Sequence, residues 1–420
     1  MKRTIAALGA ALMVLGACTK SDSSGGTSSG TAAQTGGSIR GELTVWLDND
    51  DWAEAVIAGF NQKYPEVAIH YEKVGSVDAR GKVSLDGPAG IGPDVFIMPH
   101  DHVGNAILDG LCEPFSPELK QKYEGLLLPA ALNTAVSDGE VYALPISTEN
   151  IAFFYNKDLL GGAAVPKTFE EIIAFAETWN NAVQNKYALR WQVDDSYINY
   201  FFLTAFGMNI FGPNHDDYKN PGFDSNAVRQ GIEFHNSLRK TYNVNVADAT
   251  WDNTVAMFQR GEVPFTISGP WAIGDAKKNN VNFGIVKLPT IAGNQPRCFS
   301  GNILAAVSSY TNNPEAAFAF VEFLAGVEGA TIQYNTTGKL TALKDISSIP
   351  GLRDDPYLAG IQEQAPFADP MPTIPEVNQM WDSLKTLFTF TWDGQLSPQA
   401  AQEKAMKDYD AALEMAGKSR

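Results

Sequence analysis

Three acidic segments of the chain each follow an apolar run with the length and composition of a β-strand. Residues 48–51 are Asp-Asn-Asp-Asp, residues 100–102 are His-Asp-His, and Glu149 stands in a polar break between two such runs. Carboxylates accept hydrogen bonds from hydroxyl groups, and two of them close together can serve as acid and nucleophile in glycoside hydrolysis. These residues therefore predict either a binding site for a polar ligand or a hydrolytic site.

The two histidines of residues 100–102 suggest a metal site as a separate hypothesis. A protein zinc site needs three or four ligands at characteristic spacings. The sequence has no third ligand at a suitable spacing, no Cys-x-x-Cys and no His/Cys cluster. We therefore expect His100 and His102 to form hydrogen bonds in a loop, and we expect neither a metal nor a cofactor.

The elements around the first acidic segment follow the order strand, helix, strand. An apolar run begins at Gly41, residues 52–64 have helical spacing, and residues 67–74 form the next strand. This order implies a right-handed parallel crossover. Because ligands bind at the carboxyl ends of strands in such sheets, residues 48–51 are expected to face a ligand. The alternative is a solvated acidic turn.

Residues 142–155 predict a passage of the chain from one sheet to another. Two strand-like runs, 142–146 and 151–155, are separated by the polar break 147–150, which contains Glu149. A helix is expected over residues 169–179 after a Pro-Lys-Thr entry signal. The alternative is an ordinary pair of strands joined by a polar turn.

Aromatic residues in the second half of the chain could supply flat faces to a site. Asp195 and Tyr197 lie in a polar loop before an apolar helix, a strand over residues 263–268 leads into Gly269-Pro270-Trp271, and Trp381 lies near the start of the helix 376–390. Sugars present hydroxyls at their rim and C–H groups on their faces, so carboxylates combined with rings suit them. Asp195 could equally be only a helix cap, and Trp271 a core residue.

The length of the chain indicates two domains. About 380 residues remain for folding after the N-terminal segment, which exceeds the size at which a single core usually stops growing. Hydrophobic residues make up 44% of the chain, and its net charge is −17. This charge argues against nucleic acid as a partner and against a basic membrane-binding face.

The N-terminus has the features of a targeting segment. Lys2 and Arg3 precede an apolar core, and Leu15-Gly16-Ala17-Cys18 resembles a bacterial lipobox, in which the cysteine is lipidated. Residues 19–37 are rich in Ser, Gly and Thr and predict a flexible tether with a mean reach of about 25 Å. We expect an extracytoplasmic protein anchored to the membrane by lipid on Cys18. Secretion with an incidental cysteine is the alternative.

The other two cysteines leave two states open. Cys112 and Cys298 could form a disulfide in an oxidising compartment or remain buried thiols. Their separation in the sequence does not decide between these states.

The motif Phe258-x-x-Gly-Glu-x-x-x-x-Ile-x-Gly-Pro-Trp271 resembles the signature of the maltose/maltodextrin-binding family of extracellular solute-binding proteins. Gly-Pro-Asp-Val-Phe at residues 92–96 and Lys-Leu-Thr-Ala-Leu at residues 339–343 resemble further segments of that family, in the same order. The resemblance covers essentially the whole mature chain. It implies the periplasmic-binding-protein fold, in which two α/β lobes are joined by crossover segments and enclose a ligand cleft.

The resemblance also implies a function and a division of the chain. Residues 38–147 with 300–350 would form the N-lobe, and residues 148–299 with 351–420 the C-lobe. The protein would bind an oligosaccharide of the maltose/maltodextrin class as a monomer and deliver it to the permease subunits of an ABC transporter. The expected ligand-binding residues are Asp50, Met98, Asp101, His102, Glu149, Asp195, Tyr197, Tyr200, Trp271, Trp381 and Lys385.

The chain departs from the family pattern at three positions. Met98 stands where maltose binders have a tryptophan, Asp51 where they have a lysine, and His102 where they have an arginine. These changes leave open another disaccharide, such as trehalose, as the ligand.

Two other classes of function remain as alternatives. A secreted glycoside hydrolase would need two of the carboxylates about 5–5.5 Å or 6.5–9.5 Å apart. A binder of amino acids, peptides or metals would need an arginine clamp or His/Cys ligands. The two-lobe crossover and the Gly-Pro-Trp motif argue against the hydrolase, and the absence of a Gly-x-Ser-x-Gly motif and of a partner motif for either internal cysteine argues against a nucleophilic enzyme. We therefore expect a binding protein that is not an enzyme.

Overall fold

The computed structural model describes residues 39–420. The expected targeting segment 1–18, the lipidation site Cys18 and the tether 19–37 lie outside the described residues. No helix within residues 39–420 combines the length and the apolar character needed to cross a membrane.

The strands of the described chain are β1 (Gly41–Leu47), β2 (Val67–Lys73), β3 (Val95–Pro99), β4 (Val136–Ser137), β5 (Glu140–Val141), β6 (Leu144–Asn150), β7 (Ala152–Asn156), β8 (Leu189–Arg190), β9 (Phe265–Ser268), β10 (Phe283–Val286), β11 (Cys298–Val307), β12 (Leu340–Thr341) and β13 (Ala368–Pro370).

The α-helices are α1 (Asp50–Lys63), α2 (Ser76–Asp86), α3 (Val103–Leu108), α4 (Pro117–Leu126), α5 (Pro129–Asn133), α6 (Phe169–Trp179), α7 (Ser196–Thr204), α8 (Asn226–Ser237), α9 (Val255–Gln259), α10 (Ile273–Lys278), α11 (Pro314–Ala325), α12 (Val327–Thr337), α13 (Ala359–Gln364), α14 (Val377–Trp392) and α15 (Pro398–Met415).

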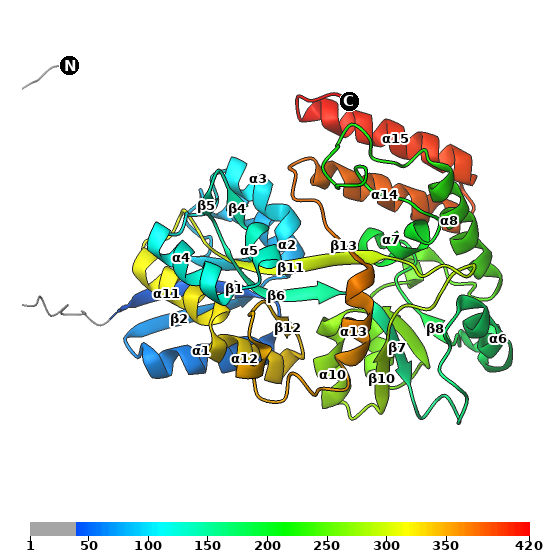
Figure 1. Cartoon of the computed structure of the whole chain (residues 1–420), viewed down its shortest axis with the longest axis horizontal. Coiled ribbons are helices and arrows are strands. Elements are labelled where there is room, and N and C mark those ends of the chain that lie inside the picture. Colours follow the sequence, from blue (N-terminus) through cyan, green and yellow to red (C-terminus); the bar gives the residue numbers. More distant parts are fainter. Residues whose placement is uncertain (1–38) are drawn as a thin grey trace, which may run out of the picture. The chain divides into compact units, whose positions relative to one another are not determined.

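The first half of the chain builds most of a seven-stranded sheet with the order β12-β6-β11-β3-β1-β2, to which β13 adds beside β11 (Figure 1). β1 pairs in parallel with both β2 and β3, which confirms the expected crossover. β11 enters from the second half of the chain and pairs antiparallel with β3 and β6.

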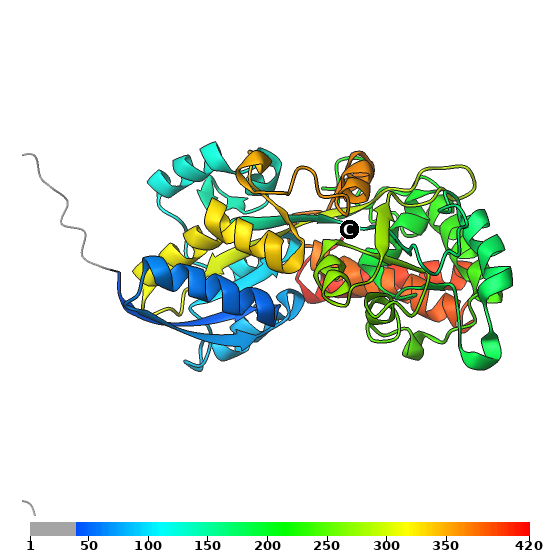
Figure 2. The same cartoon turned by 90° about the horizontal axis from the view of Figure 1, so that it is seen from below.

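Alternating side chains of this sheet pack into two separate cores. Val45 and Leu47 of β1 point into one core, whereas Trp46 between them points into the other. Successive side chains of a strand point to opposite faces, so an apolar run such as β1 is buried on both sides. Helices α2 and α3 cover one face, and α1, α11 and α12 cover the other. Figure 2 shows blue α1 beside yellow α11.

The second sheet has four strands in the order β10-β7-β9-β8. Phe153 of β7 packs with side chains of α6 and α7 on one face. Its neighbour Phe154 points to the other face, where α9, α10 and α13 lie. The aromatic run of β7 therefore joins helices on both faces of this sheet.

The passage between the sheets occurs at Ile151, because β6 belongs to the first sheet and β7 to the second. The expected polar break over residues 147–150 is wrong, since these residues continue β6 as a regular strand. Their backbone groups are paired with β11, where Glu149 lies opposite Gly301 and Asn150 opposite Ser300. Tertiary pairing thus outweighs the low strand propensity of Glu and Asn.

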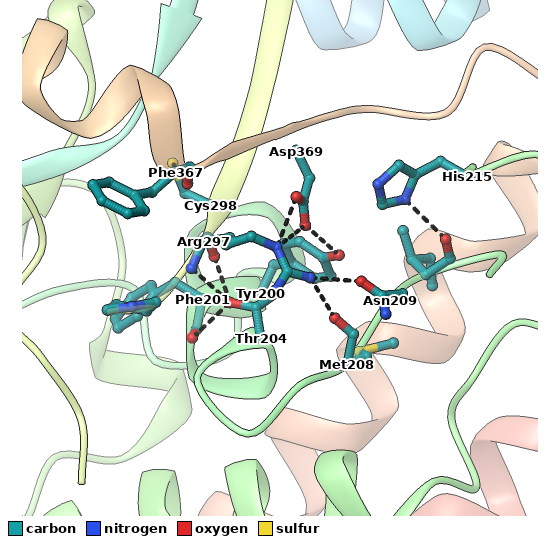
Figure 3. A network of polar contacts seen from close by, with 12 residues as sticks. Tyr200, Phe201, Thr204, Met208, Asn209, His215, Arg297, Cys298, Phe367 and Asp369 are labelled. Carbon is teal, nitrogen blue, oxygen red and sulfur yellow. Dashed lines mark hydrogen bonds and ion pairs between the residues drawn. The ribbon is translucent and has the colours of Figure 1, made fainter. Parts of the chain in front are cut away.

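An ion-pair network fixes the start of β11 to its surroundings (Figure 3). Arg297 Nε donates to both carboxylate oxygens of Asp369 in β13, at 2.8 and 3.0 Å. The same carboxylate accepts a hydrogen bond from the hydroxyl of Tyr200 in α7 at 3.1 Å. Arg297 also donates to the carbonyl oxygen of Met208 and to Asn209 Oδ1. The parallel neighbours β11 and β13 and the helix α7 are therefore held in one arrangement.

The two described cysteines are free thiols, Cys112 and Cys298, and both are buried. Burial raises the pKa of each thiol to about 12. Since a thiol, not a thiolate, is present at neutral pH, neither residue is poised to act as a nucleophile. Because both cysteines are free, the structure has no disulfide between Cys112 and Cys298.

Candidate functional site

A cavity of about 520 Å³ is lined by residues that belong to elements of both sheets. Hollows of similar volume beside α15 have no aromatic side chain in their walls, whereas this cavity contains several. Ligand pockets of 300–1,000 Å³ with apolar walls and a few polar groups are typical of small-molecule sites. We call this cavity the pocket. The predicted site residues that line it are Asp101, His102, Glu149, Asp195, Tyr197, Trp271, Trp381 and Lys385.

A buried lysine joins two carboxylates in the wall of the pocket. Lys339 Nζ lies 3.2 Å from Asp48 Oδ2 and 3.5 Å from Glu149 Oε1. The three side chains are 6%, 19% and 10% exposed, respectively, so the group is largely shielded from water. Ser147 Oγ donates a further hydrogen bond to Glu149 Oε1 at 3.3 Å. We call Asp48, Glu149 and Lys339 the charged triad.

Burial and charge act against each other on the pKa values of the charged triad. Burial raises the pKa of Glu149, and the neighbouring Asp48 raises it further, while Lys339 and Ser147 oppose the rise. Burial alone would lower the pKa of Lys339, but Asp48 and Glu149 outweigh burial and hold this pKa above its ordinary value. Lys339 is therefore a fixed cation around which the two carboxylates are arranged.

Asp101 lies in a short 3₁₀ helix directly after β3 and is tied to helix α14. Trp381 Nε1 donates to Asp101 Oδ2 at 3.0 Å. On one side of Asp101, His100 Nδ1 accepts the backbone N–H of Asn302 at 2.9 Å, so its Nε2 donates to the carbonyl oxygen of Met371 at 3.2 Å. Burial lowers the pKa of His100, which keeps the ring neutral and this bonding pattern intact. His100 thus has a structural role, as expected.

His102 lies on the other side of Asp101, and its Nε2 is 3.9 Å from Asp101 Oδ2. Burial lowers the pKa of His102 as well. Among residues 39–420, no group of three or more His, Cys, Asp or Glu side chains is arranged to hold a metal ion.

The start of α7 forms another part of the wall. Asp195 is the N-cap of this helix, and its carboxylate accepts the backbone N–H of Ile198 at 2.8 Å. Burial raises the pKa of Asp195, and the backbone N–H of Ile198 opposes the rise. Ser196 Oγ donates to the carbonyl oxygen of Trp381 at 2.9 Å, which joins α7 to α14. Asp195 is therefore both a helix cap and a pocket residue.

Aromatic rings form a connected cluster along the pocket. The Tyr197 ring lies 6.2 Å from that of Trp271 and 6.0 Å from that of Phe299. Phe299 in turn packs edge-on against Trp381 at 5.6 Å. Phe299 also stacks on Tyr200 at 3.8 Å, which connects the cluster to the network of Figure 3. We call Tyr197, Trp271 and Trp381, which line the pocket, the ring cluster.

Steric hindrance explains why the Gly-Pro-Trp turn begins with a glycine. A Cβ atom added to Gly269 would lie 2.2 Å from the indole of Trp271. Any other residue would displace this ring, so the motif sets the position of a pocket side chain.

Three predicted site residues do not line the pocket. Asp50 is exposed in the first turn of α1, where it accepts hydrogen bonds from Tyr71 and Lys73 at 2.8 and 2.6 Å. Met98 of β3 is fully buried on the face of the sheet that α2 and α3 cover. Tyr200 is fully buried against Phe299.

Sequence reasoning missed several pocket residues. The loop 48–51 was expected to face a ligand, but Asn49 caps α1 and only Asp48 lines the pocket. The position of Asp48 directly after β1 was the available signal. Lys339, Asn302 and Trp251 also line the pocket. Lys339 begins the segment 339–343 that resembles the family, which was an available signal, whereas nothing in the local sequence distinguishes Asn302 and Trp251.

A family model described as Bacterial extracellular solute-binding protein matches residues 55–360, well over half of the chain. The chain belongs to this family. The resemblance to solute-binding proteins inferred from the Gly-Pro-Trp motif and its neighbours is therefore confirmed.

Two relatives of this solute-binding protein match over most of its length. The galactooligosaccharide-binding protein of Bacillus subtilis (strain 168) is 27% identical over 400 residues, which cover 93% of this chain and 92% of the relative. A maltooligosaccharide ABC transporter solute-binding lipoprotein of Streptococcus pneumoniae (strain ATCC BAA-255 / R6) is 28% identical over 397 residues, 89% of each chain. Both names describe binding proteins and neither describes an enzyme.

A solved structure confirms the expected fold of the solute-binding protein. The crystal structure of a cyclo/maltodextrin-binding protein complexed with maltotetraose matches with a TM-score of 0.70 and 26% identity, and the match covers 90% of this chain and 99% of the other. The bilobed α/β arrangement predicted from the sequence is thus confirmed.

Proposed function

We propose that this protein is the carbohydrate-binding component of an ABC importer and that it holds an oligosaccharide of the maltose/maltodextrin class, unchanged, in the pocket. The observation that carries this proposal is the pairing of the ring cluster with buried carboxylates in one cavity. Rings bind the C–H faces of a sugar, and carboxylates accept its rim hydroxyls.

Some polar atoms of the pocket residues support a ligand rich in hydroxyl groups. Asp48 Oδ1, Asp101 Oδ1 and Ser268 Oγ are buried and have no hydrogen-bond partner among residues 39–420. A buried polar group without a partner costs about 1–3 kcal/mol. A ligand hydroxyl group that hydrogen-bonds to such an atom would recover this free energy, and an apolar ligand would not.

The names of the relatives bear on the identity of the sugar. One relative is named for maltooligosaccharides and one for galactooligosaccharides. The solved neighbour contains maltotetraose. We favour a maltooligosaccharide, and galactooligosaccharides are the second candidate because the Bacillus subtilis relative matches over 93% of this chain.

The mechanism that we propose is closure of two lobes over the sugar. We assign residues 38–147 and 300–350 to one lobe and residues 148–299 and 351–420 to the other. A ligand that contacts both lobes favours the closed form, because it binds that form more tightly than the open one. Permease subunits of the transporter would recognise the closed form, and lipid on Cys18 would hold the protein at the membrane.

Truncation of the ring cluster tests the proposal. In Trp271→Ala, the dissociation constant for the bound oligosaccharide should rise at least tenfold, about 1.4 kcal/mol, because one ring face is lost. Isothermal titration calorimetry measures this change. Trp179→Ala is the matched control, because Trp179 of α6 lies outside the pocket. Equal affinity of Trp271→Ala and the wild type would show that the indole has only a packing role.

A further inference from the structure

Helix α2 has an apolar face that residues 39–420 leave uncovered. Ala79 and Val83 of this helix point into the core and are fully buried. On the opposite side, Val77, Gly81 and Leu85 recur every four residues, which places them along one face of the helix. Val77 is 64% exposed, Leu85 is 75% exposed, and Gly81 between them is exposed as well. We call these three residues the α2 face.

The apolar surface continues past the end of α2. The ring of Tyr310 lies against Gly87, since a Cβ atom added to this glycine would be 2.3 Å from the ring. Ile91 is also exposed, and its N–H donates to the carbonyl oxygen of Asp86 at 3.1 Å. Single exposed apolar side chains need no explanation, but several gathered in one region indicate contact with another molecule.

Packing within the protein does not explain Gly81. A glycine destabilises the interior of a helix, and other glycines in helices of this protein allow a close approach. A Cβ atom on Gly231 of α8 would lie 2.7 Å from the carbonyl oxygen of Phe202, and one on Gly274 of α10 would lie 2.9 Å from that of Thr336. Apart from its chain neighbours and its own helix backbone, no atom of residues 39–420 lies within 4 Å of a Cβ atom added to Gly81.

The charged side chains beside the α2 face are paired within the protein. Lys82 pairs with Asp86, and its ammonium group lies 3.9 Å from the centre of the Trp46 ring. Arg80 Nη1 lies 3.5 Å from Asp109 Oδ2. These neutralised pairs leave a face that suits an apolar segment of a partner. A second copy of this chain is disfavoured as the partner, because each copy has a net charge of −17.

We propose that a permease subunit of the importer docks on the α2 face and seats an apolar segment directly on the helix backbone at Gly81. This inference rests on the proposed function. Val77 lines the pocket and is also largely exposed, so the α2 face begins where the pocket meets the surface. A subunit that receives the sugar has to approach this edge, and its apolar segment then extends over Gly81 to Leu85. The glycine permits the close approach.

The test measures sugar uptake and sugar binding for the same variants. Cells of the source organism that lack the native copy produce the full chain, and initial uptake rates of radiolabelled maltotriose and galactotriose are compared at equal protein levels. Gly81→Gln should lower uptake at least tenfold, because its side chain holds the permease away from the helix. Leu85→Ser should lower uptake at least threefold, because an apolar contact is lost. In calorimetric titrations, both soluble variants should bind the transported sugar within twofold of the wild-type affinity.

Two substitutions elsewhere are the matched controls. Gly125 in the last turn of α4 is exposed and also has open space around an added Cβ atom, and Val183 is 98% exposed. Gly125→Gln and Val183→Ser should keep uptake within twofold of the wild type. Both glutamine variants should raise the melting temperature, because glutamine favours a helix more than glycine does. A loss of uptake in Gly81→Gln then does not come from unfolding.

Other outcomes contradict the inference. Wild-type uptake in either α2 variant would free the α2 face from any docking role, and an affinity loss equal to the uptake loss would make it part of the sugar site. A wild-type dimer that Gly81→Gln converts to a monomer in sedimentation velocity would assign the face to a second copy. If the wild type binds neither sugar or restores no uptake, the proposed function fails and the inference with it. That result differs from failure of the inference alone, in which the wild type and the α2 variants all restore uptake.

Discussion

Replacing Lys339 with methionine is expected to lower the free energy of unfolding by about 3–5 kcal/mol at pH 7.5. The substitution removes the cation that lies 3.2 Å from Asp48 and 3.5 Å from Glu149. Two largely buried carboxylates then face each other without compensation. Chemical denaturation followed by circular dichroism measures the loss, and calorimetry should show that oligosaccharide affinity falls with it.

The pH dependence of the stability loss in Lys339→Met, measured as the free energy of unfolding relative to the wild type, identifies the cause of this loss. Burial already raises the pKa of Glu149, and loss of Lys339 raises it further. A carboxyl whose pKa is higher in the folded than in the unfolded state stabilises the protein as the pH falls. The deficit relative to the wild type should therefore shrink from pH 8 to pH 5.

Lys73→Met is the matched control for Lys339→Met. Lys73 also pairs with an aspartate, Asp50, at 2.6 Å, but the two side chains are 59% and 62% exposed. Exposed pairs contribute about 0–1 kcal/mol, so this variant should be close to the wild type. Similar losses in the two lysine variants, or a Lys339→Met deficit independent of pH, would contradict the role assigned to the charged triad.

His235 is expected to make the protein sensitive to acid. It is fully buried among Trp191, Phe202, Phe388 and Trp392, and burial lowers its pKa to about 3. The unfolded chain binds the proton near pH 6.5, so the free energy of unfolding should fall by about 1.4 kcal/mol per pH unit below that value, or roughly 3 kcal/mol at pH 4. Urea titrations from pH 7 to pH 4 measure this slope.

The variant His235→Leu isolates this contribution. It removes the titrating ring and leaves an apolar side chain in an apolar site, so the part of the acid slope due to His235 should disappear. The control His70→Leu changes an exposed histidine that pairs with Glu42, and it should retain the wild-type slope. An unchanged slope in His235→Leu would mean that other groups cause the acid sensitivity.

The local pattern of apolar residues predicts the strands and the parallel crossover, because the side chains of the strands are buried on both faces of the sheet. β1 and β2 begin at their expected positions, residues 41 and 67. β6 shows the limit of this reasoning. Its polar end is a strand because β11 and β12, both more than 140 residues away in the sequence, supply the hydrogen-bond partners.

Local pattern also predicts only some of the pocket residues, because other pocket residues are positioned by contacts that are distant in the sequence. Residues that directly follow a strand or open a helix, such as Asp101 and Tyr197, reach the pocket as expected. Tyr200 lies one helical turn further along α7 and is turned into the core by its stacking on Phe299. Lys339 meets Asp48 from 291 residues away, so no local pattern could have predicted that these two side chains pair.

The most direct test of the central claim is a calorimetric titration of the soluble chain from Ile39 with maltose, maltotriose, trehalose and a galactooligosaccharide, with each sugar analysed afterwards. The account predicts saturable binding at roughly micromolar affinity, about −8 kcal/mol, to at least one oligosaccharide, which is recovered intact. Cleavage of the sugar would contradict the account and assign catalytic roles to carboxylates such as Glu149 and Asp101. Absence of binding to all four sugars would contradict the carbohydrate proposal and favour a peptide or amino-acid ligand.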